Sequence, residues 1–341
     1  MGSVALFVPH VGCPQQCSFC DQRAITGGAQ PPEPWQVWQT AQVAASHLGQ
    51  QVKDTEIAFF GGSFTAIPRG QMLALLAPAK EAVERFGFRG LRCSTRPDAI
   101  DGEVLSLLKA YHMVAVELGA QSMDGEVLRR NRRGHSPEDT VRAAGLIRAA
   151  GLELGLQMMT GLYGSTPEKD VETARALIAL KPATVRVYPT VVLEGTHLAA
   201  LYRQGHYHPQ TLEEAVALCA RLLPLFEEAG VRVIRVGLHA QEDVERRRVA
   251  GPYHPAFREL VESRRFLAQL LPELEKQPPG AYAVRVCPRQ LSVATGQRRC
   301  NLEALARRGY AVRFAPDASL APGRFGVGPQ ETRNEKGKQA Q

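Results

Sequence analysis

Three cysteines lie within eight residues near the amino terminus, as Cys13, Cys17 and Cys20 in the spacing C-x3-C-x2-C. A short loop can direct all three sulfurs at one point, and soft thiolate ligands select zinc or iron–sulfur chemistry. Three thiolates on a cubane cluster leave one iron free to bind a substrate or cofactor directly. The segment therefore predicts a metal centre in which these three cysteines are ligands.

A structural zinc site is the main alternative, with His10 as its fourth ligand. Zinc knuckles usually pair two CxxC-like halves, however, and the sequence contains no second half. Three cysteines without metal are the other alternative. The remaining cysteines are scattered, and we expect each to be an ordinary small buried residue: Cys93, Cys219, Cys287 and Cys300.

The cysteine loop follows a predicted strand, and strands then alternate with helices along much of the chain. Short apolar, β-branched runs predict six strands: Val4–Val8, Glu56–Phe60, Leu91–Ser94, Val114–Leu118, Leu152–Met158 and Thr184–Tyr188. Amphipathic segments predict the helices between them: Trp35–Leu48, Gln71–Arg85, Glu103–Tyr111, Pro137–Ala150 and Glu168–Leu180. Asp101, Ser136 and Thr166 have side chains suited to cap three of these helices.

This alternation predicts an α/β fold, because parallel strands need right-handed crossover connections. Six βα units are fewer than the eight of a closed TIM barrel. We therefore predict a partial (β/α)6 TIM-like barrel whose functional site lies at the carboxyl ends of the strands. A further helix over Leu212–Ala229 and a strand over Val231–Val236 extend the barrel.

The pattern changes at the charged run Gln241–Arg248, where we place a domain boundary. The predicted domains are a barrel over residues 1–240, a small basic α+β extension over 241–332, and a disordered tail over 333–341. The extension holds few predicted elements, too few for a second large enzyme domain: strands at Ala283–Cys287 and Ala311–Ala315 and a helix near Asn301–Arg308.

The chain of 341 residues has a net charge of +7, and the excess is confined to its last part. Residues 1–202 contain 19 basic and 19 acidic side chains, whereas residues 203–341 contain 22 and 15. This asymmetry favours a polyanionic partner, with nucleic acid first and an anionic metabolite second. A basic surface that is merely solvated is the alternative.

Membrane and secreted classes are disfavoured by the same sequence. No apolar run approaches the length of a membrane span, and the first residues lack the basic region and cleavage site of a secretion signal. We therefore predict a soluble, cytoplasmic protein with no membrane partner. In that reducing compartment clustered thiols bind metal more often than they form disulfides.

Polar and small residues follow the other predicted strands. Gly61, Gly62 and Ser63 come after the second strand, where paired glycines would let the backbone approach a ligand closely or would form a tight turn. Glu117 and Gln121 lie at the end of the fourth strand. The basic run Arg129–His135 follows, and it would clamp a carboxylate or phosphate or form a solvated face.

The C-x3-C-x2-C motif after a first strand, with an aromatic residue before its last cysteine, resembles the radical S-adenosylmethionine (radical SAM) superfamily. The resemblance implies that Cys13, Cys17 and Cys20 bind a [4Fe-4S] cluster whose open iron is chelated by SAM. It implies that Phe19 packs near the adenine. An electron from a donor such as flavodoxin or ferredoxin would then cleave SAM to methionine and a 5'-deoxyadenosyl radical.

The same resemblance assigns cofactor contacts at the other strand ends. Gly61, Gly62 and Ser63 are similar to the superfamily's glycine-rich motif, whose backbone holds the amino group of SAM. Two further residues resemble SAM contacts of the oxygen-independent coproporphyrinogen oxidases, in which a Gln reaches the ribose and an Arg reaches the carboxylate: Gln121 and Arg133. Glu117, which lies in the same phrase ELGAQS as Gln121, completes the implied cofactor-binding set.

A narrower resemblance covers roughly residues 55 to 240. The phrases STRPD, ELGAQS, RRGH, GLELGLQMMTGLYG and VRVYPTVVLEGTHLAALYRQGHYHP occur in the order found in the catalytic subunit of Elongator, which modifies the wobble uridine of tRNA. The resemblance implies modification of a tRNA base. One group of residues would border the substrate pocket or would form a buried loop that packs on the barrel: Tyr188, Pro189, Thr190, Glu194, Gly195, Thr196, Tyr202, Gly205 and Tyr207.

Departures from that subunit leave alternatives open. The spacing of the cysteines is shorter here, and the last hundred or so residues do not suit an acetyltransferase fold. Use of acetyl-CoA is therefore not implied. A radical SAM enzyme acting on a small metabolite, such as a tetrapyrrole, is the second hypothesis. A non-catalytic cluster or zinc protein that serves as a binding module is the third.

Overall fold

The computed structural model describes residues 2–8, 17–20, 31–239 and 242–330. Cys13, His10 and the predicted tail 333–341 lie outside these residues. The chain divides into two compact units, Met1–Pro255 and Ala256–Gln341, and each has a sheet of its own. The sequence placed the boundary at residue 240, whereas in the structure the first unit continues to Pro255.

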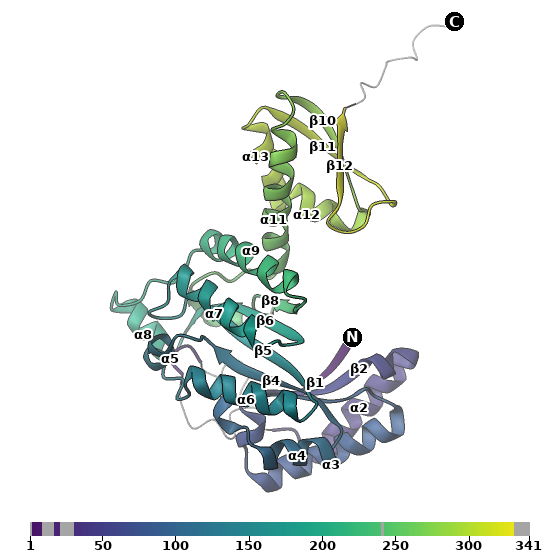
Figure 1. Cartoon of the computed structure of the whole chain (residues 1–341), viewed down its shortest axis with the longest axis vertical. Coiled ribbons are helices and arrows are strands. Elements are labelled where there is room, and N and C mark those ends of the chain that lie inside the picture. Colours follow the sequence, from purple (N-terminus) through teal and green to yellow (C-terminus); the bar gives the residue numbers. More distant parts are fainter. Residues whose placement is uncertain (1, 9–16, 21–30, 240–241, 331–341) are drawn as a thin grey trace, which may run out of the picture. The chain divides into compact units, whose positions relative to one another are not determined.

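The first unit is built on a seven-stranded parallel sheet with the order β1-β2-β3-β4-β5-β6-β8 (Figure 1). The sheet curls and stays open at β1 and β8, with helices around its outer side. The predicted partial barrel is confirmed, and the predicted extension strand is β8. The strands are β1 (Gly2–Val8), β2 (Thr55–Gly61), β3 (Gly90–Thr95), β4 (Met113–Gln121), β5 (Glu153–Thr160), β6 (Thr184–Pro189) and β8 (Arg232–Val236).

The helices of this unit begin close to where the sequence places them. The side chains of Asp101, Ser136 and Thr166 each accept a hydrogen bond from the first turn, so all three predicted caps are confirmed. The helices are α2 (Pro34–Leu48), α3 (Arg69–Phe86), α4 (Gly102–Ala110), α5 (Gly125–Arg130), α6 (Pro137–Ala149), α7 (Pro167–Ala179), α8 (His197–Arg203), α9 (Leu212–Glu228) and α10 (Glu242–Arg247). Short 3-10 turns are η1 (Gly49–Asp54), η2 (Phe64–Ala66) and η3 (Pro97–Ala99).

A second, two-stranded ladder explains why the first unit extends beyond residue 240. Strand β7 (Val192–Leu193) pairs antiparallel with β9 (Arg248–Ala250). The two strands are too short for a hydrophobic period to reveal them. Their pairing ties the charged run after residue 241 to the barrel.

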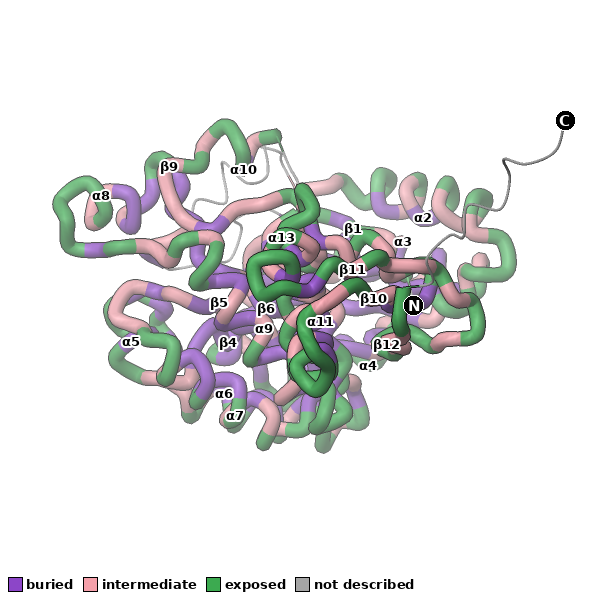
Figure 2. Tube along the Cα trace, turned by 90° about the horizontal axis from the view of Figure 1, so that it is seen from above, coloured by how far each residue is buried: buried purple, intermediate pink, exposed green. Residues whose placement is uncertain are grey.

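The inner strands β3 and β4 are buried on both faces, as expected of a parallel sheet covered by helices, whereas the edge strand β1 is partly exposed. Figure 2 shows β4 and β5 as largely buried. Ile57, Phe59, Leu118 and Leu156 are fully buried in this core. The hydrophobic strands therefore form a rigid frame, and the polar residues at their carboxyl ends are positioned by it.

The second unit has a three-stranded sheet with the order β11-β10-β12, in which β10 runs parallel to β11 and antiparallel to β12. Its elements are α11 (Phe257–Leu274), β10 (Gly280–Val286), η4 (Pro288–Gln290), α12 (Leu291–Thr295), η5 (Gln297–Arg299), α13 (Cys300–Ala306), β11 (Tyr310–Pro316) and β12 (Phe325–Pro329). The sequence predicted β10, β11 and α13 but missed the 18-residue α11. Phe266, Leu270, Val284 and Leu305 lie in its core.

The predicted burial of the four scattered cysteines is confirmed for three of them. Cys93, Cys219 and Cys287 are buried as expected, but Cys300 is exposed, because it is the first residue of α13 after a tight turn. No helix within the described ranges is long and apolar enough to cross a bilayer.

Candidate active site

The carboxyl ends of the parallel strands bring the predicted site residues to one edge of the barrel. In the strand register Val8 pairs with Gly61, Thr95 with Leu118, and Gln121 with Met158. Cys17 and Cys20, the two predicted cluster ligands within the described residues, follow β1 at this edge. This is the edge at which the sequence predicted a functional site.

Arg133 joins the cysteine segment to strand β4. Its Nη1 donates to Cys17 Sγ at 3.4 Å, and its Nη2 donates to the carbonyl of Gly119 at 2.5 Å. Arg133 and Cys17 are buried, and the backbone N–H of Cys20 donates to the carbonyl of Cys17 at 3.1 Å. A predicted cluster ligand and a predicted cofactor contact, 116 residues apart in sequence, thus lie against one another.

Gln121 lies beside this contact. A Cβ atom added at Gly119 would lie 3.1 Å from Gln121 Nε2 and 3.3 Å from Arg133 Nη2, so the glycine makes room for both side chains. Gln121 is buried and has a φ of 65°, in the left-handed region that a non-glycine residue adopts at a cost. The fold therefore holds Gln121 and Arg133 together at the end of β4.

Asn131 fixes the segment between the two described cysteines, a role that the sequence did not suggest. Its carbonyl accepts from the N–H of Ser18 at 3.0 Å, and its Oδ1 accepts from Ser18 Oγ at 2.7 Å. Its Nδ2 donates to the carbonyl of Tyr163 at 2.9 Å. The carbonyl of Ser18 accepts from the N–H of Leu198 at 2.7 Å. Ser18 is thus held directly by the β4–α6 connection and by α8, and through Asn131 by the β5–α7 connection.

Phe19 packs into a hydrophobic cluster rather than standing free. The buried members of this cluster are Val192, Leu198, Ala199 and Tyr207. All four belong to the part of the Elongator-like phrase that follows β6. Phe19 therefore connects the cysteine segment with the segment that the sequence placed beside the substrate.

The glycines after β2 bring that strand close to β1. Gly61 has a φ of 120°, and a Cβ there would lie 2.6 Å from the carbonyl oxygen of Val8. The N–H of Gly62 donates to the same oxygen at 2.9 Å. Ser63 Oγ accepts from the N–H of Arg96 at 3.1 Å and lies 2.9 Å from Thr95 Oγ1. Ser63 thereby links the ends of β2 and β3.

Glu117 anchors a polar network inside the barrel, four residues before Gln121. Its carboxylate is fully buried and accepts from Arg186 Nε at 2.9 Å, from Ser94 Oγ at 3.4 Å and from the Gln157 amide. Burial opposes the charge of Arg186, but Glu117 and Tyr188 outweigh it and raise the pKa of Arg186. Arg186 also lies 4.9 Å from the ring centre of Phe60. The sequence identified Glu117 but not its partners.

Replacing Arg186 by methionine is expected to lower the free energy of unfolding by about 3–5 kcal/mol, because the buried Glu117 carboxylate loses its countercharge. Urea unfolding measures this change. The double variant Arg186→Met/Glu117→Gln should recover most of the loss. The exposed pair Arg175–Glu172 is the matched control, and Arg175→Met should cost less than about 1 kcal/mol. Equal losses for Arg186→Met and Arg175→Met would contradict the prediction.

His135 gives the first unit a dependence on pH. Burial lowers its pKa to about 4, and the nearby Arg133 cation acts in the same direction. Below about pH 6.5, His135 is protonated in the unfolded chain but stays neutral in the folded chain. The free energy of unfolding is therefore highest above pH 6.5 and falls as the pH drops toward 4. The expected loss is about 3 kcal/mol. The free energy of unfolding of His135→Gln, measured with urea between pH 7.5 and 4.5, should depend less on pH than that of the wild type. An equal pH dependence in the two proteins would contradict the prediction.

Comparison with known proteins places this geometry in a family. The sequence profile of the Radical SAM superfamily matches residues 7–177, half of the chain, and that of the Radical SAM C-terminal domain matches residues 182–266. The chain belongs to the radical SAM superfamily. It is therefore an enzyme of that superfamily, and its cofactors are a [4Fe-4S] cluster and SAM.

Several radical SAM relatives act on tRNA according to their names. The chain is 28% identical over 269 residues to the tRNA uridine(34) acetyltransferase of Dehalococcoides mccartyi, covering 68% of this chain and 58% of the relative. It is 32% identical over 238 residues to Elongator complex protein 3 of Danio rerio, covering 64% and 42%. The chain thus spans less than two thirds of either relative.

A solved structure shows the same radical SAM fold. Archaeal Elp3 from Methanocaldococcus infernus, with an N-terminal deletion, superposes with a TM-score of 0.61 at 22% identity, covering 81% of this chain and 62% of that chain. The similarity confirms the partial barrel with its C-terminal extension.

The residues present fit the SAM cofactor. Gln121 Oε1 and Arg133 Nε are buried and have no hydrogen-bond partner among the described residues. Such groups are costly unless a ligand satisfies them. SAM offers hydroxyl donors for the amide oxygen and a carboxylate for the guanidinium. Arg133 also donates to Cys17 Sγ, so one of these two side chains reaches the cysteine segment on which the cluster is expected.

Residues of the Elongator-like phrase make structural hydrogen bonds, and some also line a cavity. Thr196 caps α8, and Thr190 Oγ1 donates to the carbonyl of Thr160 at 2.7 Å. Tyr207 OH donates to the carbonyl of Gly161 at 2.6 Å. Tyr207 also lines a cavity of about 820 Å³ between the end of β5 and the start of α9, with His206 and His208. Structural bonds therefore account for part of the phrase.

Proposed function

We propose that this radical SAM enzyme modifies a tRNA base, with the wobble uridine as the first candidate. The observation that supports the proposal is the similarity over 269 residues, 68% of this chain, to a relative named tRNA uridine(34) acetyltransferase. The basic C-terminal third provides a surface suited to a polyanion. The proposal concerns the base that is modified and leaves the transferred group open. It places the enzyme in the cytoplasm.

We assign the cluster to Cys13, Cys17 and Cys20. When bound and reduced, the cluster supplies the electron that cleaves SAM to methionine and a 5'-deoxyadenosyl radical. The Arg133 guanidinium lies 3.4 Å from Cys17 Sγ, where a cation stabilises a thiolate. Because both side chains are buried, water is kept from this sulfur.

The SAM contacts follow from the same site. We assign the carboxylate of SAM to Arg133 and a ribose hydroxyl to Gln121, which satisfies both unpartnered atoms. The backbone of Gly61, Gly62 and Ser63 is assigned to the amino group, and Phe19 to the adenine. Glu117 belongs to this set as a positioning residue: through Arg186, Gln157 and Ser94 it fixes the strands that carry the site.

The experiment combines three measurements on anaerobically purified protein. We expect about four irons per chain, formation of 5'-deoxyadenosine from SAM with dithionite or with reduced flavodoxin or ferredoxin, and binding of bulk tRNA at physiological salt. Nucleoside mass spectrometry of the incubated tRNA then identifies the modified base. SAM cleavage by a protein that binds tRNA no better than a nonspecific polyanion would overturn the RNA substrate. That outcome would favour a small metabolite, such as a tetrapyrrole.

A further inference from the structure

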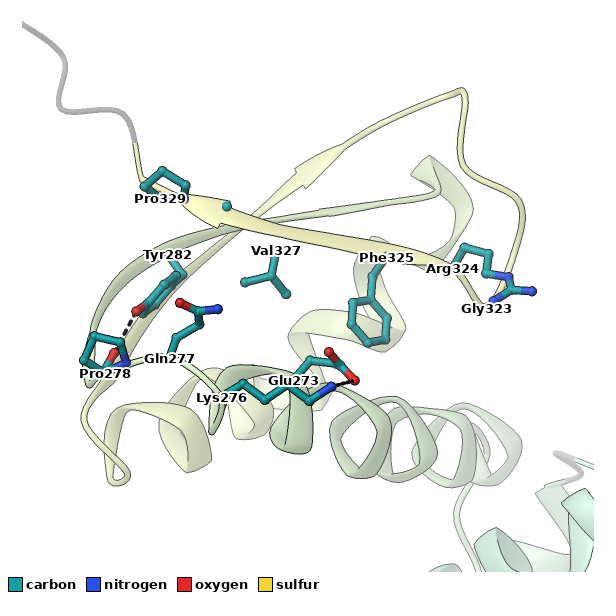
Figure 3. Close-up of a pocket in the computed structure, with 11 residues that line it drawn as sticks. Glu273, Lys276, Gln277, Pro278, Tyr282, Gly323, Arg324, Phe325, Val327 and Pro329 are labelled. Carbon is teal, nitrogen blue, oxygen red and sulfur yellow. Dashed lines mark hydrogen bonds and ion pairs between the residues drawn. The ribbon is translucent and has the colours of Figure 1, made fainter.

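The second unit contains a groove of about 770 Å³ that is separate from the barrel site (Figure 3). One wall is the carboxyl end of α11 with the turn that follows it, and the other is strand β12. Strand β12 is an edge strand, since among the described strands it pairs with β10 alone. The cavity is thus framed by one helix end and one sheet edge of a single compact unit.

Two aromatic rings line the groove, and both are held in place. Tyr282 OH donates to the carbonyl of Pro278 at 2.7 Å. Phe325 packs edge-on against the buried Phe266, with ring centres 5.6 Å apart. Tyr282 and Phe325 are only partly buried. Rings fixed in this way keep exposed surface on which a planar group can stack at little entropic cost.

The rim of the groove is cationic and polar. Arg324 is exposed, and its side chain has no ion pair among the described residues. Lys276 pairs with Glu273 at 2.7 Å. Figure 3 shows the Gln277 amide extending into the groove between the α11 end and β12. An amide can donate to and accept from the edge of a nucleobase.

The charge of the surrounding unit points to a polyanion. Residues 256–330 contain 12 basic and 6 acidic side chains, an excess of six, whereas the whole chain has a net charge of +7. Residues 256–330 therefore account for six of the seven net positive charges of the protein. An acidic rim would suit a cationic ligand, and an enclosed apolar pocket would suit a neutral metabolite. Aromatic rings with surrounding cations are typical of sites for single-stranded nucleic acid.

We propose that this groove binds one nucleotide of a single-stranded RNA segment. The base stacks on Tyr282, its edge meets the neighbouring Gln277 amide, and the flanking phosphates meet Arg324 and Lys276, while Phe325 lines the far end of the groove. The inference rests on the proposed tRNA substrate and adds to it a second point of contact outside the barrel. An unpaired loop or end of a tRNA exposes such a nucleotide, whereas its paired stems do not.

The test uses the full chain with its cluster reconstituted and compares two matched double variants. Lys276→Glu/Arg324→Glu reverses two charges in the groove. Arg307→Glu/Arg308→Glu reverses two exposed charges at the end of α13 in the same unit. Fluorescence anisotropy measures the binding of bulk tRNA and of a ten-nucleotide single-stranded RNA. Thermal unfolding verifies that each variant is folded.

We expect the groove variant to bind both RNAs at least about tenfold more weakly than wild type, and the control variant to lose about twofold. Gln277→Ala, which changes no charge, should weaken the single-stranded RNA about threefold. Ultraviolet crosslinking of a 4-thiouridine-labelled RNA should map to peptides that contain Tyr282 or Phe325.

Each contrary result has a separate meaning. Equal losses in the two double variants, or crosslinks confined to other peptides, would overturn the groove assignment while leaving the tRNA substrate intact. Absence of tRNA binding by the wild-type protein would overturn the proposed function itself. Full RNA binding by the groove variant would likewise overturn the groove assignment.

Discussion

The Cys17→Ala variant is expected to lose the cluster, with iron falling from about four to below one per chain. Two remaining thiolates cannot hold a cubane in a site that also exposes one iron to SAM. Formation of 5'-deoxyadenosine should fall at least about a thousandfold, because the electron no longer has a path into SAM. Iron and sulfide analysis, the visible spectrum and the SAM cleavage assay measure these losses on one preparation.

Cys93→Ala is the matched control for this variant. Cys93 is buried on β3 in the same barrel, and burial raises the pKa of its thiol to about 12. A thiol that stays protonated is a poor metal ligand. The control should therefore keep its iron and its SAM cleavage. Full iron content in Cys17→Ala, or equal iron loss in Cys93→Ala, would show that the cluster is held by other residues.

The Arg133→Met variant is expected to keep its iron but to bind SAM about ten- to a hundredfold more weakly. The Arg133 side chain donates two hydrogen bonds, to Cys17 Sγ and to the Gly119 carbonyl, and its buried Nε is available to the carboxylate of SAM. Loss of a charge-assisted hydrogen bond costs about 1.5–3 kcal/mol. Equilibrium dialysis of SAM and iron analysis separate the two effects.

The neighbouring Arg132 is the control for Arg133. It is exposed and lies 3.1 Å from the His197 ring, on the outside of the site. Arg132→Met should leave iron content and SAM affinity unchanged. Arg133→Lys tests geometry, since it keeps the charge but cannot bridge two partners in one plane. If Arg133→Met lost its iron together with SAM binding, the side chain would act on the cluster segment rather than on the cofactor.

The barrel was predictable because its signals are local. Hydrophobic runs located the six strands, and the caps at Asp101, Ser136 and Thr166 located helix starts, since a cap bonds within its own first turn. The cysteine spacing and the glycines after β2 are likewise contained in short segments. Such features need no knowledge of distant contacts.

Other features depend on distant partners or were obscured by neighbouring residues. Asn131 acts through Ser18, 113 residues away, and Arg186 through Glu117, 69 residues away, so neither stands out in the sequence. Helix α11 was missed because charged residues and Pro272 interrupt its apolar stripe. That stripe nonetheless repeats at helical spacing through Phe266, Leu270 and Leu274, a signal that could have found it.

The bonds of Ser18 also determine when the cysteine segment can reach its final position during synthesis. Its partners are Asn131 and the N–H of Leu198, so the segment that carries Cys17 and Cys20 acquires its final position only after residue 198 has left the ribosome. A cluster delivered earlier would meet thiols on an unformed loop. The positioned cysteine segment therefore requires at least the first 198 of the 341 residues.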